Sequence, residues 1–286
     1  MHAEALGDRV KQTIDRMPVA FFGHGTPMNA ISDNQFTKAW ERFGRRVKPQ
    51  AIVVISAHWC TEGVSVTAMA RPRTIHDFGN FPEPLFKVSY PAPGSPALAE
   101  RICELLSPIG ANLDQKHWGF DHGTWSILVK AYPSADVPVV QLSVDYSRSP
   151  RFHFEVGRLL RPLREEGVLI LGSGNVVHNL EVFRRQDPDF KYDWAIEFND
   201  YIRKCVELSE FERILDYEAF GRAAALSVPT PDHFFPLLYV LGAAGTDTPT
   251  IEIDGVYQGS ISMLSVSYGT VVAPAGRSAA TLIPSD

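Results

Sequence analysis

Short apolar runs rich in β-branched residues recur along the chain, and each is bounded by turn residues. They occupy residues 18–23, 51–57, 137–144 and 167–174. A continuous apolar run of this length is typical of a strand buried on both faces. The stretches 95–110 and 153–167 between them have helical periodicity, and the second ends in Gly167, as a helix C-terminus should. This alternation predicts an α/β sandwich with a largely parallel central sheet flanked by helices.

The rest of the chain extends this single pattern. Residues 193–220 again have helical periodicity, and residues 261–272 alternate like a closing strand. Neither a linker nor a repeat interrupts the sequence, so we expect one domain over 1–286. The segment 71–96 is long, rich in proline and aromatic residues, and too apolar for a solvated linker. We therefore predict that it forms a wall or lid over a site.

Composition narrows the functional classes. Hydrophobic residues make up 45% of the 286, enough for a substantial core, and 27 basic against 33 acidic residues give a net charge of −6 without a long basic block. Nucleic acid is therefore not an expected partner. We also expect no membrane partner and a cytoplasmic location, because long apolar runs and a signal-peptide core are missing. Cys60, Cys103 and Cys205 are far apart and are interpreted as reduced packing residues.

Several of the nine histidines lie where a functional site is expected. His24 and His58 directly follow predicted strands, and His178 follows a third by four residues. Ligands bind beyond the carboxyl ends of strands in open α/β sheets, and imidazole is the commonest protein metal ligand. A fourth candidate, His233, lies in the loop-like sequence TPDHFFP. Any one of these could be a hydrogen-bonded loop or core histidine, but three after three strand ends predict a metal site.

Further histidines and three aspartates are weaker candidates for the same site or have other interpretations. His122 lies in WGFDHGTWSIL beside an acidic residue, and we predict that it lines the active site. His76 is a weaker candidate of the same kind, while His117 and His153 are interpreted as ordinary surface or helix-start residues. Three aspartates stand next to histidines and could orient them or, less favourably, bind metal. They are Asp77, Asp121 and Asp232.

Other common catalytic signatures are missing from the sequence. It contains no HExxH, no P-loop and no GxSxG. The stretch GSGNVV lacks the third glycine of a dinucleotide-binding fingerprint, and we interpret it as a turn.

Several motifs taken together resemble one known family. They are GHGTPMNAI, QAIVVISAHW, TIHDFGNFP, YPAPGSPALA, WGFDHGTWSIL, GSGNVVHNL, PTPDHFFPLLYVLGA and SISMLSV, in that order. In this sequence they resemble the 4,5-DOPA dioxygenase extradiol branch of the class III extradiol ring-cleaving dioxygenases, from about Met17 to about Tyr268. Plant members that make betalain pigment carry a proline-containing loop where this chain reads HNLEVF, so either L-DOPA or a related catechol is implied as the substrate.

The resemblance implies a site and a reaction. The implied metal ligands are His24, His58 and His233, and His178 lines the same site as a further ligand or as the acid/base residue. His122 resembles a family histidine that contacts substrate or oxygen. The implied reaction is extradiol cleavage of a catechol by O₂ with Fe(II), which needs several exchangeable positions on the metal. Imidazole donors also suit zinc, so Zn(II) could occupy the same site.

Three other functions use some of the same features. A zinc hydrolase would need the same histidines and a general base, for which Asp121 or Asp232 could serve. A non-catalytic relative of the fold would bind partners and lack the metal or its open positions. A tetrapyrrole chelatase can also have a GHG-like turn after its first strand, but SAHW and GSGNVVHN are not expected there. We rank the dioxygenase first, the hydrolase second and the binding protein third.

Overall fold

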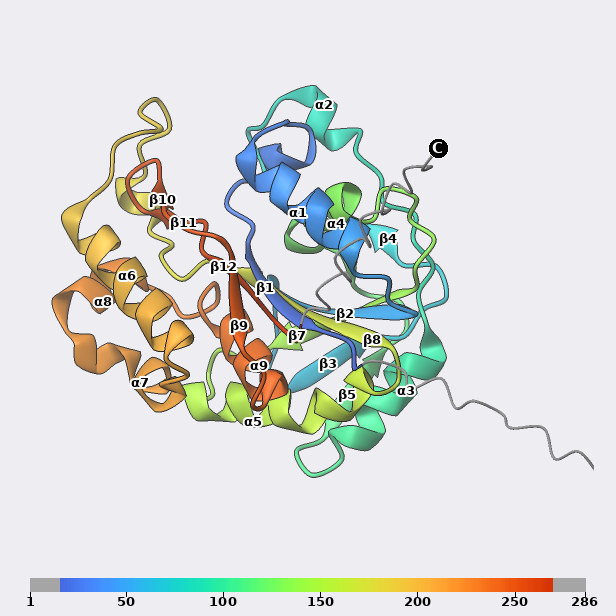
Figure 1. Cartoon of the computed structure of the whole chain (residues 1–286). Coiled ribbons are helices and arrows are strands. Elements are labelled where there is room, and N and C mark those ends of the chain that lie inside the picture. Colours follow the sequence, from blue (N-terminus) through green and yellow to red (C-terminus); the bar gives the residue numbers. More distant parts are fainter. Residues whose placement is uncertain (1–15, 270–286) are drawn as a thin grey trace, which may run out of the picture.

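One sheet forms the centre of the molecule, for which a computed structural model describes residues 16–269 (Figure 1). Its eight strands lie in the order β5 (Ala111–Asp114), β3 (Val64–Thr67), β7 (Val139–Val144), β2 (Ala51–Cys60), β8 (Val168–Gly174), β1 (Val19–Gly23), β12 (Ser265–Tyr268) and β9 (Pro249–Ile253). The central strands β7, β2, β8 and β1 are mutually parallel. Antiparallel pairs occur towards the edges, between β3 and β7, β1 and β12, and β12 and β9. The predicted, largely parallel sheet is confirmed.

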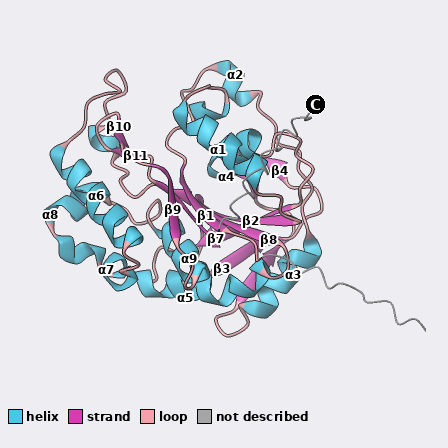
Figure 2. Ribbon diagram, viewed as in Figure 1, coloured by secondary structure: helices cyan, strands magenta, loops and turns pink. Residues whose placement is uncertain are grey.

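Helices cover both faces of this sheet, as Figures 1 and 2 show. Successive residues of a strand point to opposite faces, so Phe21 packs into one core and Phe22 into the other. The first core contains side chains of α3 (Pro96–Leu105), α5 (Pro150–Leu160) and α9 (Phe235–Ala244). The second contains those of α1 (Gln35–Arg46) and α4 (His122–Ala131). The described residues therefore form the expected α/β sandwich.

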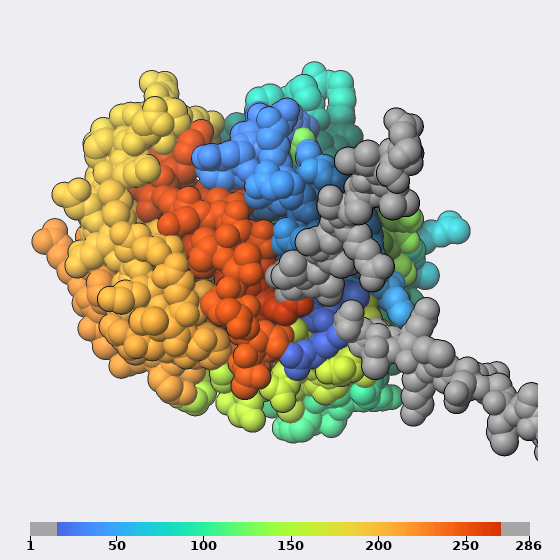
Figure 3. Space-filling view, in the orientation of Figure 1, coloured from blue at the N-terminus to red at the C-terminus, as the bar shows by residue number. Residues whose placement is uncertain are grey.

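The remaining elements extend the sandwich at its edges. Three further helices, α6 (Asp193–Glu207), α7 (Phe211–Leu215) and α8 (Arg222–Ser227), lie together and contribute buried side chains to the first core. In Figure 3 the chain around 250–265 runs as a band between this helical part and the N-terminal part. Short elements make up the rest: α2 (Glu83–Phe86), β4 (Arg73–Thr74), β6 (Gly119–Phe120), β10 (Val256–Tyr257), β11 (Ile261–Ser262), η1 (Pro27–Ala30), η2 (Arg161–Arg164), η3 (Leu180–Val182) and η4 (Tyr217–Phe220). Within residues 16–269 none of the helices has the length and apolar composition required to cross a membrane.

Some predicted boundaries change in the structure. Strand β2 continues to Cys60, so His58 lies within the strand, two residues before its end, rather than after it. The sequence GSG is the end of strand β8 and not a turn, because neighbouring strands pair with it on both sides. The predicted closing strand 261–272 consists of β11 and β12 up to Tyr268, and its last residues lie outside the described part.

Candidate metal centre

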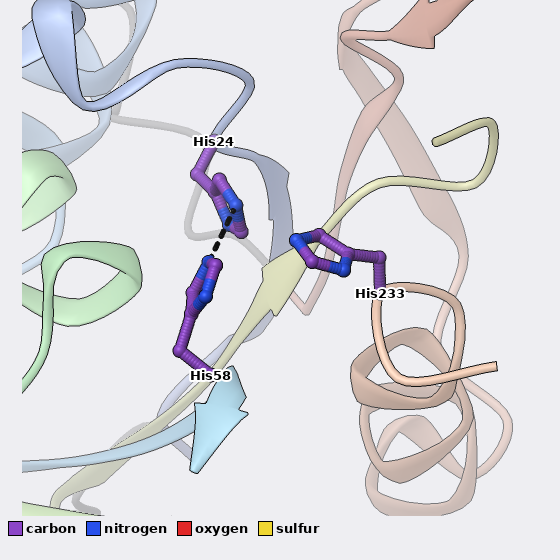
Figure 4. A group of neighbouring side chains, drawn as sticks. All are labelled: His24, His58 and His233. Atoms are coloured by element: carbon purple, nitrogen blue, oxygen red, sulfur yellow. Dashed lines mark hydrogen bonds between the residues drawn. The ribbon is translucent and has the colours of Figure 1, made fainter. Parts of the chain in front are cut away.

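Three histidines from distant parts of the sequence converge at the carboxyl edge of the sheet. His24 follows β1, His58 lies near the end of β2, and His233 lies in the turn before α9. One ring nitrogen from each lies within 4.8 Å of the others. Figure 4 shows the three rings turned towards a common point. The strand-end histidines are therefore neighbours, and His233 joins them from the far end of the chain.

The end of strand β8 holds two of these histidines by their backbones. The carbonyl of Gly174 accepts a hydrogen bond from the His24 amide (3.1 Å), and the Asn175 amide donates one to the His233 carbonyl (2.8 Å). A Cβ at Gly174 would lie 2.2 Å from that His233 oxygen, so only glycine permits the contact. After strand β1, Gly25 has φ +64°, which lets the chain turn immediately after His24.

Hydrogen bonds fix which nitrogen of His24 is free. Its Nδ1 lies 3.0 Å from the hydroxyl of Ser173, and that hydroxyl donates its one proton to the carbonyl of Gly123 (2.6 Å). Ser173 can therefore only accept from His24, so Nδ1 carries the proton. The lone pair of Nε2 is then available to a metal ion.

Carboxylates also lie beside the other two rings. The Asp232 carboxylate accepts a hydrogen bond from Nδ1 of His233, and the Asp77 carboxylate lies 3.5 Å from Nδ1 of His58. Because a carboxylate only accepts hydrogen bonds, Nδ1 of His233 holds its proton and its Nε2 presents a lone pair. His24 and His233 thus have the arrangement in which a protein partner orients an imidazole for metal binding.

The free nitrogens fit a cation. The Nε2 atoms of His24 and His58 are 3.2 Å apart, and Nε2 of His233 is buried without a hydrogen-bond partner in the described structure. Burial, followed by the nearby imidazoles, lowers the pKa of His24 and His58 well below 6.5. The two rings are therefore neutral at pH 7, which is the form that binds metal. Unpaired, buried nitrogens are costly unless another group satisfies them, and a metal ion would.

Asp77 lies between His58 and His122. Its carboxylate accepts hydrogen bonds from the backbone amide (2.8 Å) and Nδ1 (2.9 Å) of His122, whose ring centroid lies 3.8 Å from that of His58. Burial alone would raise the pKa of Asp77, but the bonds and charge of His122 outweigh it, so the pKa lies below its ordinary value. A second group of potential ligands is His58, Asp77 and His122, but it shares His58 with the first. We interpret Asp77 as the hydrogen-bond partner of the His122 imidazole, which also lies near that of His58.

The predicted aspartates therefore differ in their roles. Asp77 and Asp232 contact histidines, as expected. Asp121 contacts Ser56 and Gln141 instead and caps helix α4 through the amide of Thr124. Burial, followed by the charge of Asp77, raises the pKa of Asp121. Asp121 precedes His122 in the sequence because it caps the helix that begins at His122. Its side chain is fully buried.

His178 lies beside the three converging histidines without joining them. Its ring stacks on that of His233, with centroids 3.5 Å apart and planes 5° apart. Within residues 16–269 the groups of closely spaced donor atoms do not include it. Its backbone is fixed by a hydrogen bond to Ser227 (2.8 Å) and by a bridge to Ile261. Burial, followed by the charge of His233, lowers the pKa of His178 well below 6.5.

A cavity of about 870 Å³ opens over these histidines. The rings of His24, His58, His122, His178 and His233 contribute to its lining, and aromatic side chains form much of its wall: Phe36, Phe78, Phe81, Phe183 and Tyr257. Two of these phenylalanines belong to the segment 71–96, which supports its prediction as a wall of the site. A cavity with aromatic walls and a few polar groups suits a planar organic ligand.

Other histidines have structural surroundings. His153 lies in the first turn of α5, is fully buried, and has Nδ1 3.0 Å from the hydroxyl of Tyr239. It is a helix-start residue, as interpreted, but the interpretation as a surface residue was wrong. Helix periodicity placed it on the buried face, packed against Phe235. His76 bonds the carbonyl of Val88, and His117 is exposed.

Sequence reasoning missed two residues of the site. Ser173, which fixes the ring of His24, was hidden in a stretch read as a turn. Arg185 lines the cavity, but no motif marked it. The glycines on both sides of Ser173 were the available signal, since they indicate a strand end that other chain segments approach closely.

Comparisons with known proteins give a consistent result. Residues 18–271 match the family described as the catalytic LigB subunit of aromatic ring-opening dioxygenase. A relative from Escherichia coli K12, named 4,5-DOPA dioxygenase extradiol, is 51% identical over 262 residues, covering 89% of this chain and 95% of the relative. A relative of the same name from Beta vulgaris is 38% identical over 92% of this chain and 96% of its own. A crystal structure of an uncharacterized Escherichia coli K12 protein has a TM-score of 0.78 and 47% identity, covering 88% of this chain and all of that one.

Proposed function

Because this chain belongs to the family of catalytic LigB subunits of aromatic ring-opening dioxygenases, we propose that it cleaves L-DOPA or a related catechol at a metal held by His24, His58 and His233. The chain is an extradiol ring-cleaving dioxygenase, an enzyme that inserts O₂ into a catechol ring beside its two hydroxyls. The observation that carries the ligand set is the convergence of three imidazoles, of which those of His24 and His233 have Nδ1 engaged by a hydrogen bond.

Fe(II) is the proposed metal. When bound, Fe(II) would supply the redox chemistry that ground-state O₂ needs to react with an aromatic ring. Imidazole ligands add no negative charge, so the double positive charge of the ion stays intact, which favours an anionic catecholate as its ligand. The same nitrogens also suit Zn(II), which would occupy the site without redox activity.

His178 is proposed as the acid/base residue. It lines the cavity, stacks on His233 and stands outside the group of converging nitrogens. An imidazole in this place can take a proton from a catechol hydroxyl and return one during ring opening. Its alternative role as a fourth ligand has less support, because its ring packs face to face against His233.

His122 is proposed to contact the substrate or O₂. Asp77 holds its Nδ1, so Nε2 is the ring atom left to a ligand, and the residue lines the cavity. Its position at the start of helix α4 fixes the backbone, because the amide is bound by the same carboxylate (2.8 Å). A ring held at two points is preorganised for binding.

The names of the relatives and the shape of the cavity support a catechol substrate. The relatives from Escherichia coli and Beta vulgaris are both named 4,5-DOPA dioxygenase extradiol, and the aromatic wall suits a planar ring. This similarity favours the dioxygenase over the zinc hydrolase and the binding protein. All three cysteines are free, which supports our proposal that the protein works in the reducing cytoplasm.

Oxygen consumption tests this function directly. Metal-free protein would be reloaded anaerobically with Fe(II) or Zn(II) and given L-DOPA and simpler catechols in an oxygen electrode. We expect uptake of one O₂ per catechol with Fe(II), a yellow product, and no uptake with Zn(II). Stoichiometric Fe(II) binding without O₂ uptake on any catechol would overturn the proposal.

A further inference from the structure

Arg185 is the one residue with a permanently cationic side chain among those that line the cavity in the described structure. We propose that its guanidinium binds a carboxylate on the side chain of the substrate, so that the enzyme prefers carboxylated catechols to neutral or amine-bearing ones. This inference rests on the proposed function and specifies its substrate class.

The backbone of Arg185 is fixed beside the cavity. Its carbonyl accepts a hydrogen bond from the side-chain amide of Gln258 (2.6 Å), and the carbonyl of Gln258 accepts one from the amide of Arg184 (3.0 Å). Gln258 itself lines the cavity. The two bonds hold the origin of the Arg185 side chain at the cavity wall, although the chain around it is exposed.

The guanidinium lies over an aromatic ring of the opposite segment. Its central carbon is 5.7 Å from the ring centroid of Phe81, which also lines the cavity. The edge of a guanidinium carries N–H groups that match the two oxygens of a carboxylate. The contact places the guanidinium beside Phe81 at the cavity wall.

The charge of Arg185 has no carboxylate counterpart among the described residues. Within residues 16–269 the structure places no carboxylate within ion-pair distance of it. The other charged residue of the lining, Asp77, is already bonded to His122. An anionic ligand group entering the cavity would therefore find one uncompensated positive charge on its wall.

The neighbouring Arg184 provides a matched comparison. Its guanidinium carbon lies 4.2 Å from the ring centroid of Phe190, and its Nε donates to the hydroxyl of Tyr192 (3.2 Å). Arg184 does not line the cavity. The two arginines are thus adjacent and both exposed, but only Arg185 is placed to contact a ligand in the site.

Paired substrates and paired variants test the proposal. The substrates are 3-(3,4-dihydroxyphenyl)propionate, which has a carboxylate, and 4-ethylcatechol and dopamine, which do not. The wild-type protein should have a kcat/KM about tenfold higher for the carboxylated catechol, equivalent to about 1.4 kcal/mol, and added NaCl should reduce this preference. Arg185→Gln should bring the ratio close to one, Arg185→Lys should restore part of it, and Arg184→Gln should keep it. An unchanged ratio in Arg185→Gln would overturn the proposal.

A binding measurement separates this inference from the proposed function. The same ligands would be titrated anaerobically into the Zn(II)-loaded protein by calorimetry. Arg185→Gln should weaken binding of the propionate about tenfold relative to 4-ethylcatechol, whereas Arg184→Gln should leave the ratio of the two dissociation constants unchanged. If no catechol consumes O₂ but this difference remains, the proposed reaction fails and the anion site stands. Equal binding by the wild type and Arg185→Gln rejects the anion site whatever the activity.

Discussion

The imidazole of His178 lies face to face with that of His233, with ring centroids 3.5 Å apart and planes 5° apart. His178 thus packs on the flat face of His233, a proposed metal ligand. The nitrogen with which His233 would bind the metal lies on the edge of its ring. The arrangement separates the residues proposed to hold the metal from the one proposed to move protons.

Replacing His178 should therefore abolish turnover without removing the metal. We expect His178→Ala to retain stoichiometric metal while kcat falls by about a hundredfold to ten-thousandfold, the usual contribution of a positioned acid/base group. Elemental analysis of the purified variant and O₂ uptake measure the two quantities.

Two further variants serve as references for the His178→Ala experiment. His58→Ala should lose the metal but keep the fold, as seen by circular dichroism, because His58 lies near the carboxyl end of strand β2 and outside the hydrophobic cores. His117→Ala should change neither quantity, because His117 is exposed. Loss of metal from His178→Ala would instead establish His178 as a fourth ligand.

Asp232→Asn tests how strongly the orienting carboxylate supports metal binding. Asp232 accepts the Nδ1 proton of His233, and this bond outweighs the effect of burial and holds the pKa of the carboxyl well below its ordinary value. We expect the variant to bind metal about 10–100-fold more weakly, measured by competition with a chelator of known affinity. Asp216→Asn, on an exposed turn, is the control. Equal affinities in the two variants would show that the Asp232 bond is unimportant.

Gly174→Ala should disturb the site through its backbone. The new Cβ would meet the His233 carbonyl at 2.2 Å, so the turn that carries His233 must move. We expect a loss of about 1–3 kcal/mol in the free energy of unfolding, the usual cost of overpacking, together with weaker metal binding. Urea unfolding and metal analysis measure these effects. Gly79→Ala is the matched control, because its Cβ would meet nothing within 4 Å. Wild-type metal binding in Gly174→Ala would argue against the contact.

His153 should make stability depend on pH independently of the metal site. Burial lowers its pKa to about 4, below the ordinary value of 6.5. The unfolded chain therefore binds a proton that the folded protein does not, so the stability contribution is complete above pH 6.5 and is lost as the pH falls towards 4. The loss attributable to this residue is about 3 kcal/mol.

The variant His153→Asn isolates this effect. It keeps a polar group near Nδ1, which contacts Tyr239, but cannot titrate. Between pH 6.5 and 4 the wild type should lose about 3 kcal/mol more unfolding free energy than the variant, measured by urea unfolding of the metal-free proteins. Parallel pH curves for the two proteins would show that His153 does not carry the difference.

The amino-acid sequence by itself determined the framework of the sheet and part of the site. The runs that form β1, β2, β7 and β8 are continuous and apolar because both faces of these strands are covered by helices. His24 and His58 could be grouped from the sequence because parallel strands end at one edge of a sheet. His233 was a candidate from its loop-like sequence, but only the resemblance to a known family grouped it with His24 and His58, since no local pattern ties it to those strands.

Tertiary structure alone decided how these side chains are held and what surrounds them. Ser173 and Asp77 fix the tautomers of His24 and His122 through contacts between distant segments, and Arg185 reaches the cavity because Gln258 holds its backbone. The inward orientation of Asp121 likewise depends on packing against other elements. The physical reason is that periodicity records whether a residue is buried by its own strand or helix. The partner that a polar side chain meets depends instead on strand order and loop paths, which local sequence does not encode.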